Sequence, residues 1–246
     1  MQKITAAILI IGNEILSGRT QDINTQYIAT KLSEKGIVLE EARIIPDVKS
    51  CIIDTILYLR TKYTYVFTTG GIGPTHDDIT SDAIATSFGV KLIKHTEAHK
   101  RLKEYYASSN RELNVPSEKM AYIPEGATLI DNSATSAPGF IIENVYVMAG
   151  VPYIMQAMMD FVLPTLQSGS TIASRTISLL IGESLIANEM EEIENKYPDI
   201  SVGSYPSTNV GIHITSVVLR SDNITELDKA FNEFSRMVST HTTYIG

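Results

Sequence analysis

A glycine-rich turn followed by paired carboxylates is the part of the sequence best suited to chemistry. The turn runs from Gly70 to Gly73 and follows an apolar run. Glycines can adopt positive φ and present successive backbone N–H groups to an anion, and the N-terminus of a following helix favours the same charge. Asp77 and Asp78 come next, and two carboxylates beside a phosphate need a divalent cation between them. The segment therefore predicts a metal-bridged phosphate ligand.

Two common phosphate motifs do not match this turn. A Walker loop ends in Gly-Lys-Ser/Thr, which the chain lacks, and His76 occupies the third glycine position of the dinucleotide fingerprint counted from Gly71. The sequence leaves one alternative open, an ordinary strand-to-helix turn in which Asp77 or Asp78 only caps the helix.

The elements around this turn have the pattern of an α/β fold. Apolar runs of strand length alternate with helical periodicity through the first two-thirds of the chain, which predicts βαβ units around a mostly parallel sheet. Strands are expected at residues 3–11, 38–45, 65–69, 140–142 and 145–148. Helices are expected at residues 22–34, from the Cys51 region to 61, and at 80–88, 96–109 and 152–162. This α/β domain is assigned to residues 1–167.

A second, smaller domain is expected after the Pro, Ser and Gly residues of segment 164–170. Residues 171–246 follow a βαββα order, which predicts a small α+β domain of KH-like or ferredoxin-like type. Ten acidic residues outnumber five basic ones there, and no Gly-x-x-Gly loop occurs. RNA binding by this domain is therefore not expected.

Polar residues follow the ends of three predicted parallel strands. Gly12, Asn13 and Glu14 follow the first strand, Asp47 follows the second, and the glycine turn follows the third. The carboxyl ends of parallel strands meet at one edge of a sheet, where ligands bind. We expect Glu14, Asp47 and Asp78 to hold a cation there directly or through water. Asp22 and Asn24 either join this site or only cap the first helix.

Composition narrows the classes of partner. A chain of 246 residues with 43% hydrophobic content can bury a substantial core and form two domains. A net charge of -8 argues against a nucleic-acid or anionic-membrane surface, and no apolar run is long enough to span a bilayer. The single Cys51 excludes an intramolecular disulfide. We expect a cytoplasmic protein that binds neither nucleic acid nor membranes.

Taken together, these residues resemble the molybdopterin-binding-like domain of the MoaB, MogA and MoeA proteins, and most closely the CinA (competence/damage-inducible protein A) family. The resemblance covers roughly residues 3–166, and the module that follows is similar to the middle domain of CinA proteins. Its most specific element is the segment from Thr69 to Thr80. It is supported by Gly12-Asn13-Glu14-Ile15-Leu16-x-Gly18, Asp22-x-Asn24 and Ala137-Pro138-Gly139-Phe140.

The resemblance implies a MogA-like three-layer fold and a set of site residues. Asp47 and Asp78 match aspartates that carry function in MogA-like members, and our leading hypothesis places Asp77 with them as catalytic residues. The implied metal, Mg²⁺, Mn²⁺ or Co²⁺, is assigned to Asp47, Asp78 and Glu14. The implied ligand contacts are Gly12, Asn13, Glu14, Asn24, Thr69, Gly70, Gly71, Gly73, Thr75, Lys119, Ser136, Pro138 and Gly139.

The resemblance also implies two alternative functions. CinA-type domains are associated with metal-dependent hydrolysis of ADP-ribose, and the related domain of FAD synthases with FAD hydrolysis. The first alternative is therefore a nucleotide pyrophosphatase acting on an ADP-ribose-like or FAD-like dinucleotide. The second is a molybdopterin-binding protein without hydrolytic activity, acting in cofactor biosynthesis or as a carrier. A homo-oligomer, dimer or trimer, is expected, whereas the nicotinamide-nucleotide amidase activity of longer CinA proteins is not.

Overall fold

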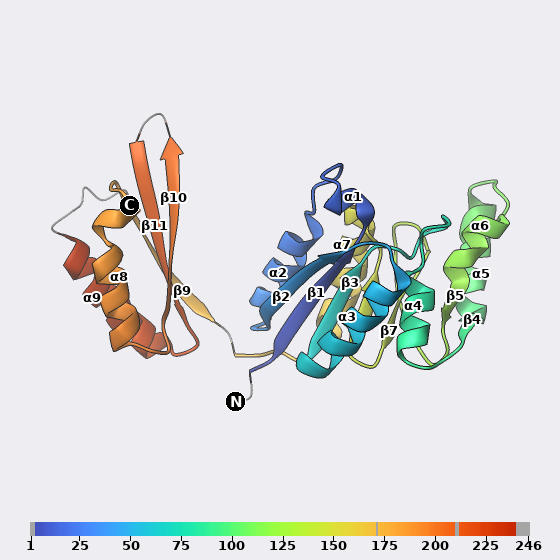
Figure 1. Ribbon diagram of the computed structural model, residues 1–246, viewed down its shortest axis with the longest axis horizontal. Coiled ribbons are helices and arrows are strands. Elements are labelled where there is room, and N and C mark those ends of the chain that lie inside the picture. Colours follow the sequence, from blue (N-terminus) through green and yellow to red (C-terminus); the bar gives the residue numbers. More distant parts are fainter. Residues whose placement is uncertain (1–2, 171, 210–211, 240–246) are drawn as a thin grey trace. The chain divides into compact units, whose positions relative to one another are not determined.

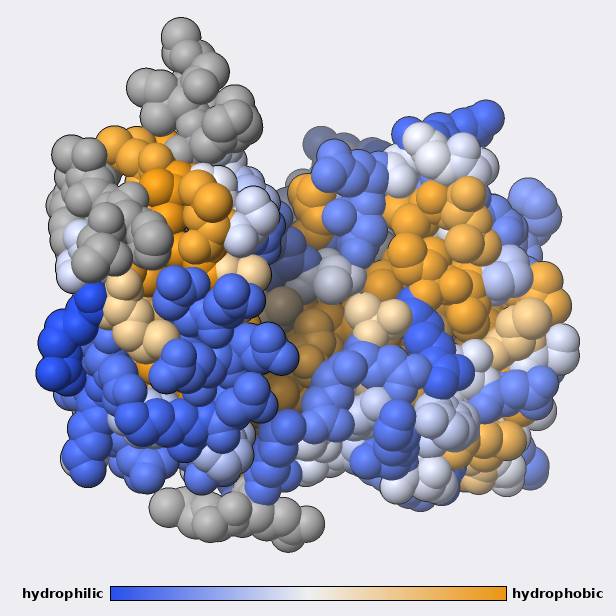
Figure 2. Space-filling view, turned by 60° about the vertical axis from the view of Figure 1, so that its left-hand side comes forward, coloured by the Kyte–Doolittle hydropathy of each residue, from blue (hydrophilic) through white to orange (hydrophobic). Residues whose placement is uncertain are grey.

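The computed structural model describes residues 3–170, 172–209 and 212–239, drawn as ribbons in Figure 1. The chain divides into two compact units, Met1–Gly169 and Ser170–Gly246. Hydrophilic residues alternate with apolar areas over the face drawn in Figure 2. None of the helices in the described ranges combines the length and the apolar composition that a membrane crossing requires.

The first unit is built on a six-stranded sheet with the order β2-β1-β3-β8-β7-β6. The parallel strands are β1 (Thr5–Ile11), β2 (Val38–Ile45), β3 (Tyr65–Thr69) and β8 (Val145–Met148). The antiparallel strands are β7 (Gly139–Ile142) and β6 (Thr128–Ile130). The predicted mostly parallel sheet is confirmed.

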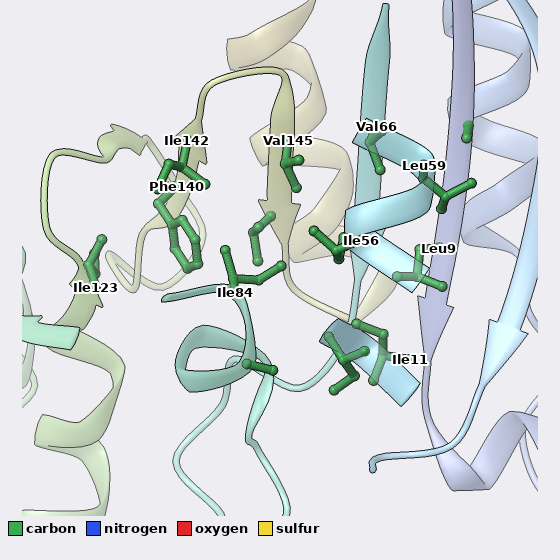
Figure 3. Packing of buried hydrophobic residues seen from close by; sticks show 14 of the residues in the cluster. Leu9, Ile11, Ile56, Leu59, Val66, Ile84, Ile123, Phe140, Ile142 and Val145 are labelled. Carbon is green, nitrogen blue, oxygen red and sulfur yellow. The ribbon is translucent and has the colours of Figure 1, made fainter. Parts of the chain in front are cut away.

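Helices cover both faces of this sheet, and the side chains of the interior strand β1 alternate between two cores. On one face, Ala6, Ile8 and Ile10 of β1 belong to a core with helices α2 (Asn24–Glu34) and α7 (Pro152–Val162). On the other, Ala7, Leu9 and Ile11 belong to a core with α3 (Lys49–Lys62) and α4 (Thr80–Ser87). Figure 3 shows Leu9, Ile56 and Ile84 of this second core. The result is the three-layer fold expected from the resemblance.

A group of short elements follows α4 in the first unit, and only part of it was predicted from the sequence. The helix α5 (Thr96–Ser108) was expected, but the two-stranded pair β4 (Leu92–Lys94) and β5 (Tyr122–Pro124) was not. The short helices α1 (Asn13–Leu16) and α6 (Val115–Glu118), and the strand β6, were also missed. Each of these strands has three residues, too few to show an alternating pattern.

The second unit has the predicted βαββα order. Its elements are β9 (Ala173–Leu179), α8 (Ala187–Lys196), β10 (Ser201–Asn209), β11 (Ile212–Ser221) and α9 (Ile224–Val238). The strands form an antiparallel sheet with β11 in the centre. Ile193 of α8 and Phe234 of α9 pack into one core with residues of the sheet. The described residues of the second unit hold three strands, whereas a ferredoxin-like domain has four.

Candidate functional site

A cleft of about 560 Å³ lies in the first unit beside the glycine turn. One wall is the turn after β3, from Gly70 to Pro74, together with Asp78. A second wall is the turn before α7, from Ala149 to Pro152, and a third comes from α5. The volume is in the range of small-molecule sites, about 300–1,000 Å³. The cleft joins the ends of β3 and β8, whereas a ligand was expected at the ends of β1, β2 and β3.

The glycine turn has a backbone that only glycine adopts without strain. Gly70 and Gly71 have φ of 104° and 70°. A Cβ atom on Gly70 would lie 2.1 Å from the carbonyl oxygen of Ile11, and one on Gly71 would lie 2.0 Å from Thr80 Oγ1. The Thr80 N–H donates to the Gly71 carbonyl at 3.0 Å, so α4 begins directly against the turn. These contacts explain why glycine occupies both positions.

Asp78 lines the cleft and is fixed by its own loop. Its Oδ2 accepts hydrogen bonds from the Thr75 N–H at 2.7 Å and from the Thr75 hydroxyl. A Cβ atom on Gly73 would lie 2.7 Å from the same oxygen, so Gly73 leaves room for this carboxylate. Lys119 donates to the Thr75 carbonyl at 2.6 Å. Thr75 and Lys119, expected as ligand contacts, therefore support the loop and do not line the cleft.

Asp77 does not lie in the cleft. Its side chain is 61% exposed, and the exposed His76 lies beside it, with Nδ1 3.9 Å from Asp77 Oδ1. Asp77 therefore lies at the loop surface, and the structure offers no support for its expected catalytic role.

Glu14 is the second carboxylate of the cleft. A Cβ atom on Gly12 would lie 2.6 Å from Glu14 Oε1, so Gly12 makes space for it. Asp47 is outside the cleft, where its Oδ2 accepts the Asn13 N–H at 2.8 Å and ties the β1–α1 turn to β2. Within the described ranges, no three His, Cys, Asp or Glu side chains are grouped closely enough to hold a metal. The expected cluster of Glu14, Asp47 and Asp78 is therefore not formed.

Asn24 supports a wall of the cleft without lining the cleft itself. The Asp22 Oδ1 accepts the N–H groups of Asn24 and Thr25 at 2.9 and 3.3 Å, so Asp22 caps α2. The Asn24 side chain donates to the Gly150 carbonyl at 2.7 Å. A Cβ atom on Gly150 would lie 3.2 Å from the Cα of Gly70. Asn24 thus holds the wall at Gly150, which packs against the glycine turn, and is itself buried.

The remaining expected ligand contacts lie in the cleft, in a separate hollow and in the sheet. Pro138 lines the cleft, whereas Ser136 lines a separate hollow beside Arg101. Thr69 is buried in β3. Gly139 is buried in β7, where a Cβ atom would lie 2.4 Å from the Val147 carbonyl oxygen. For Thr69 and Gly139, the structure indicates packing roles in place of the expected contact with a ligand.

Sequence reasoning missed the third wall. Tyr105 and Tyr106 of α5, and Arg111 after it, line the cleft opposite the glycine turn. All three lie more than thirty residues from that turn in the sequence, and the two tyrosines belong to a helix that also carries five charged side chains. The available signal was the pair of adjacent tyrosines in this helix. A helix with one buried face needs an apolar side chain at only one of two neighbouring positions, so the second tyrosine called for another role.

The fold and this cleft define a class of α/β proteins that share a three-layer domain with a glycine turn and carboxylates at one sheet edge. Comparison with known proteins gives the same class. A family model described as "Probable molybdopterin binding domain" matches residues 7–168, and one described as "FAD synthase, middle domain" matches residues 171–245. The chain belongs to the molybdopterin-binding domain family and, within it, to the CinA type.

Individual relatives support this assignment. A CinA-like protein of Chloroherpeton thalassium is 32% identical over 253 residues, which cover 98% of this chain and 59% of that protein. A putative competence-damage inducible protein of Acetivibrio thermocellus is 32% identical over 210 residues, or 82% of this chain and 51% of its own length. The chain therefore spans little more than half of these curated relatives. The crystal structure of the protein CinA with unknown function from Thermoplasma acidophilum superposes with a TM-score of 0.61 at 27% identity, covering 66% of this chain and 98% of that one.

Proposed function

We propose that the first unit is a divalent-metal-dependent pyrophosphatase that hydrolyses an ADP-ribose-like or FAD-like dinucleotide. The observation that carries this proposal is the presence of Glu14 and Asp78 in the same cleft as the glycine turn. Mg²⁺ commonly binds through one or two carboxylates and completes its shell with phosphate oxygens and water. Two carboxylates facing one cleft fit this donor set, even though no three-ligand cage is present among the described residues.

The residues of the cleft have different roles in this proposal. The Gly70 N–H donates to the Met148 carbonyl at 3.1 Å, so the backbone N–H groups from Gly71 to Gly73 are the ones that suit a diphosphate. Asp78 is held by Thr75 and is the better metal ligand, because its position is fixed before any ligand binds. No hydrogen bond to the Glu14 carboxylate occurs in the described part of the chain, so Glu14 is the group available to orient the attacking water and take its proton. A bound cation would neutralise phosphate oxygens and make water more acidic.

The experiment is an activity screen of the full chain. ADP-ribose and FAD are incubated with the protein and Mg²⁺, Mn²⁺ or Co²⁺, and AMP release is measured by chromatography, with a chelator as the blank. We expect metal-dependent AMP release, and a loss of about 100-fold or more in Asp78→Asn and Glu14→Gln. The matched control is Asp54→Asn, because Asp54 is exposed on α3 and does not line the cleft. No AMP with any metal, or full activity of Asp78→Asn, would refute the proposal.

Molybdopterin binding without turnover is the second candidate, favoured by the description of the matching family as a probable molybdopterin binding domain. It predicts that a fluorescent pterin stays with the purified protein and that neither dinucleotide is cleaved. Under this alternative, Asp78→Asn would alter retention of the pterin, and no metal would restore AMP release.

A further inference from the structure

The wall of the cleft formed by α5 has the chemistry of a ring-binding surface. Tyr105 and Tyr106 are both half-buried, and their rings meet edge to face with centroids 5.9 Å apart at 76°. The Tyr106 hydroxyl donates to Ser117 Oγ at 2.8 Å, and Ser117 is buried at the start of the next short helix. The Tyr106 ring is therefore held in place before any ligand binds.

Arg111 completes this wall with a cation. Its backbone N–H donates to the Tyr106 carbonyl at 2.9 Å, and its guanidinium carbon lies 5.1 Å from the centroid of the Tyr106 ring. Arg111 is exposed and forms no ion pair within the ranges that the structure describes. Among the described residues that line the cleft, it is also the single cation, set against Glu14 and Asp78. Its positive charge is available to an anionic ligand.

We propose that Tyr105, Tyr106 and Arg111 recognise a planar heteroaromatic ring and the phosphate next to it. The ring, whether a nucleotide base, a flavin or a pterin, stacks on the tyrosines, while the Arg111 guanidinium binds the adjacent phosphate. The glycine turn then receives the distal part of the same ligand. This inference rests on the proposed function for the identity of the site, but it concerns ring recognition and does not require hydrolysis.

The chain contains no tryptophan, which permits a direct optical test. Tyr105→Trp keeps an aromatic surface in the wall and introduces the only indole of the protein. We expect AMP to quench its fluorescence, because a stacked base quenches indole emission, whereas ribose 5-phosphate, which has no ring, leaves it unchanged. The matched control is Tyr58→Trp, since Tyr58 is a partly exposed tyrosine on α3 outside the cleft. AMP should not quench this control.

Two further variants separate the ring from the phosphate, with binding measured by calorimetry. Tyr105→Leu should weaken AMP binding about tenfold or more and leave ribose 5-phosphate unaffected. Arg111→Gln should weaken AMP about tenfold but leave adenosine unaffected, and Arg111→Lys should recover part of the loss. Circular dichroism of each variant checks that the fold is kept.

The outcomes also distinguish this inference from the proposed activity. Quenching by AMP, FAD or a pterin without any hydrolysis would support ring recognition and refute the proposed pyrophosphatase activity. The ligand that binds most tightly would show whether the ring is a nucleotide base, a flavin or a pterin. Hydrolysis with equal responses to AMP and ribose 5-phosphate would keep the enzyme and overturn the inference. Absence of quenching by every ring-bearing ligand at millimolar concentration would overturn it as well.

Discussion

At the scale of single residues, two glycines with the same backbone conformation make a matched pair. Gly71 and Gly18 have φ of 70° and 71°, but a Cβ atom would meet Thr80 Oγ1 at 2.0 Å only at Gly71, whereas Gly18 is open within 4 Å. An alanine in left-handed conformation costs about 1–2 kcal/mol at either position. We expect Gly71→Ala to lower the free energy of unfolding clearly more than Gly18→Ala, as measured by urea denaturation.

The contact with Thr80 can be tested by a double-mutant cycle. The buried Thr80 hydroxyl has no hydrogen-bond partner within the described residues, so its removal leaves no other group unsatisfied. Adding Thr80→Ala to Gly71→Ala should therefore recover part of the lost stability. Equal losses in Gly71→Ala and Gly18→Ala, with no coupling to Thr80, would mean that the close approach is unimportant.

Residues also show which parts of the site the sequence could reveal. The spacing of the three glycines predicted the turn correctly, because left-handed and crowded positions require glycine directly. Spacing could not tell Asp77 from Asp78, since only the loop's path, with Thr75 bonded to Asp78, decides which carboxylate enters the cleft. The tyrosines of α5 reach the cleft through tertiary packing, which no local pattern records.

At the scale of elements, the edge strand β2 is tied to the end of α3 by Glu41. This carboxylate accepts from the Tyr63 hydroxyl at 2.5 Å and from Arg43 Nε at 2.5 Å, and Lys62 Nζ lies 3.2 Å away. The hydrogen bond from Tyr63, and then that from Arg43, lowers the pKa of Glu41 to about 2 from an ordinary 4.5. The ionised form is thus bound more strongly in the folded state.

The lowered pKa predicts a specific loss of stability in acid. Because the folded pKa lies below the unfolded one, the contribution is complete above about pH 4.5 and is lost as the pH falls toward 2. Glu41→Gln should lower the free energy of unfolding by about 2 kcal/mol at pH 7 and by much less near pH 2. Urea denaturation at both pH values measures this difference.

The neighbouring Glu40→Gln serves as the control, because Glu40 pairs with the exposed Lys3 and should contribute less than about 1 kcal/mol. An equal loss for Glu41→Gln at pH 7 and near pH 2 would show that the carboxylate charge is not what binds β2 to α3.

The boundaries of helices and strands were predicted best where a proline or a glycine turn marks them. The bounds of β2, β3, β8 and α7 agree with the expected ranges, since Pro46 and Pro152 and the glycine turn mark three of these ends. The strands β4, β5 and β6 were missed because their partners, and not their three-residue sequences, define them.

At the scale of the whole molecule, each unit has a core of its own. Two clusters of buried residues lie within the first unit and a third within the second, and every residue that lines the cleft belongs to the first. We therefore expect a chain of residues 1–169 to fold alone, and AMP to stabilise it as much as we expect AMP to stabilise the full chain. Thermal unfolding followed by circular dichroism measures both effects.

The control for this experiment is a chain that ends after Gly150. It lacks α7, whose Met155, Met158 and Met159 fill one core, and it should not fold cooperatively. If residues 1–169 were also unfolded, the first unit would depend on the second for its stability.

The position of β2 at one edge of the six-stranded sheet has a consequence for solubility at high concentration. An open edge offers unpaired backbone groups to strands of other molecules, and charged side chains make such an edge a poor template for them. The edge β2 carries Glu40, Glu41 and Arg43, and the opposite edge, β6, is only three residues long. Neither edge of the sheet therefore favours the repeated addition of strands from other molecules that leads to amyloid.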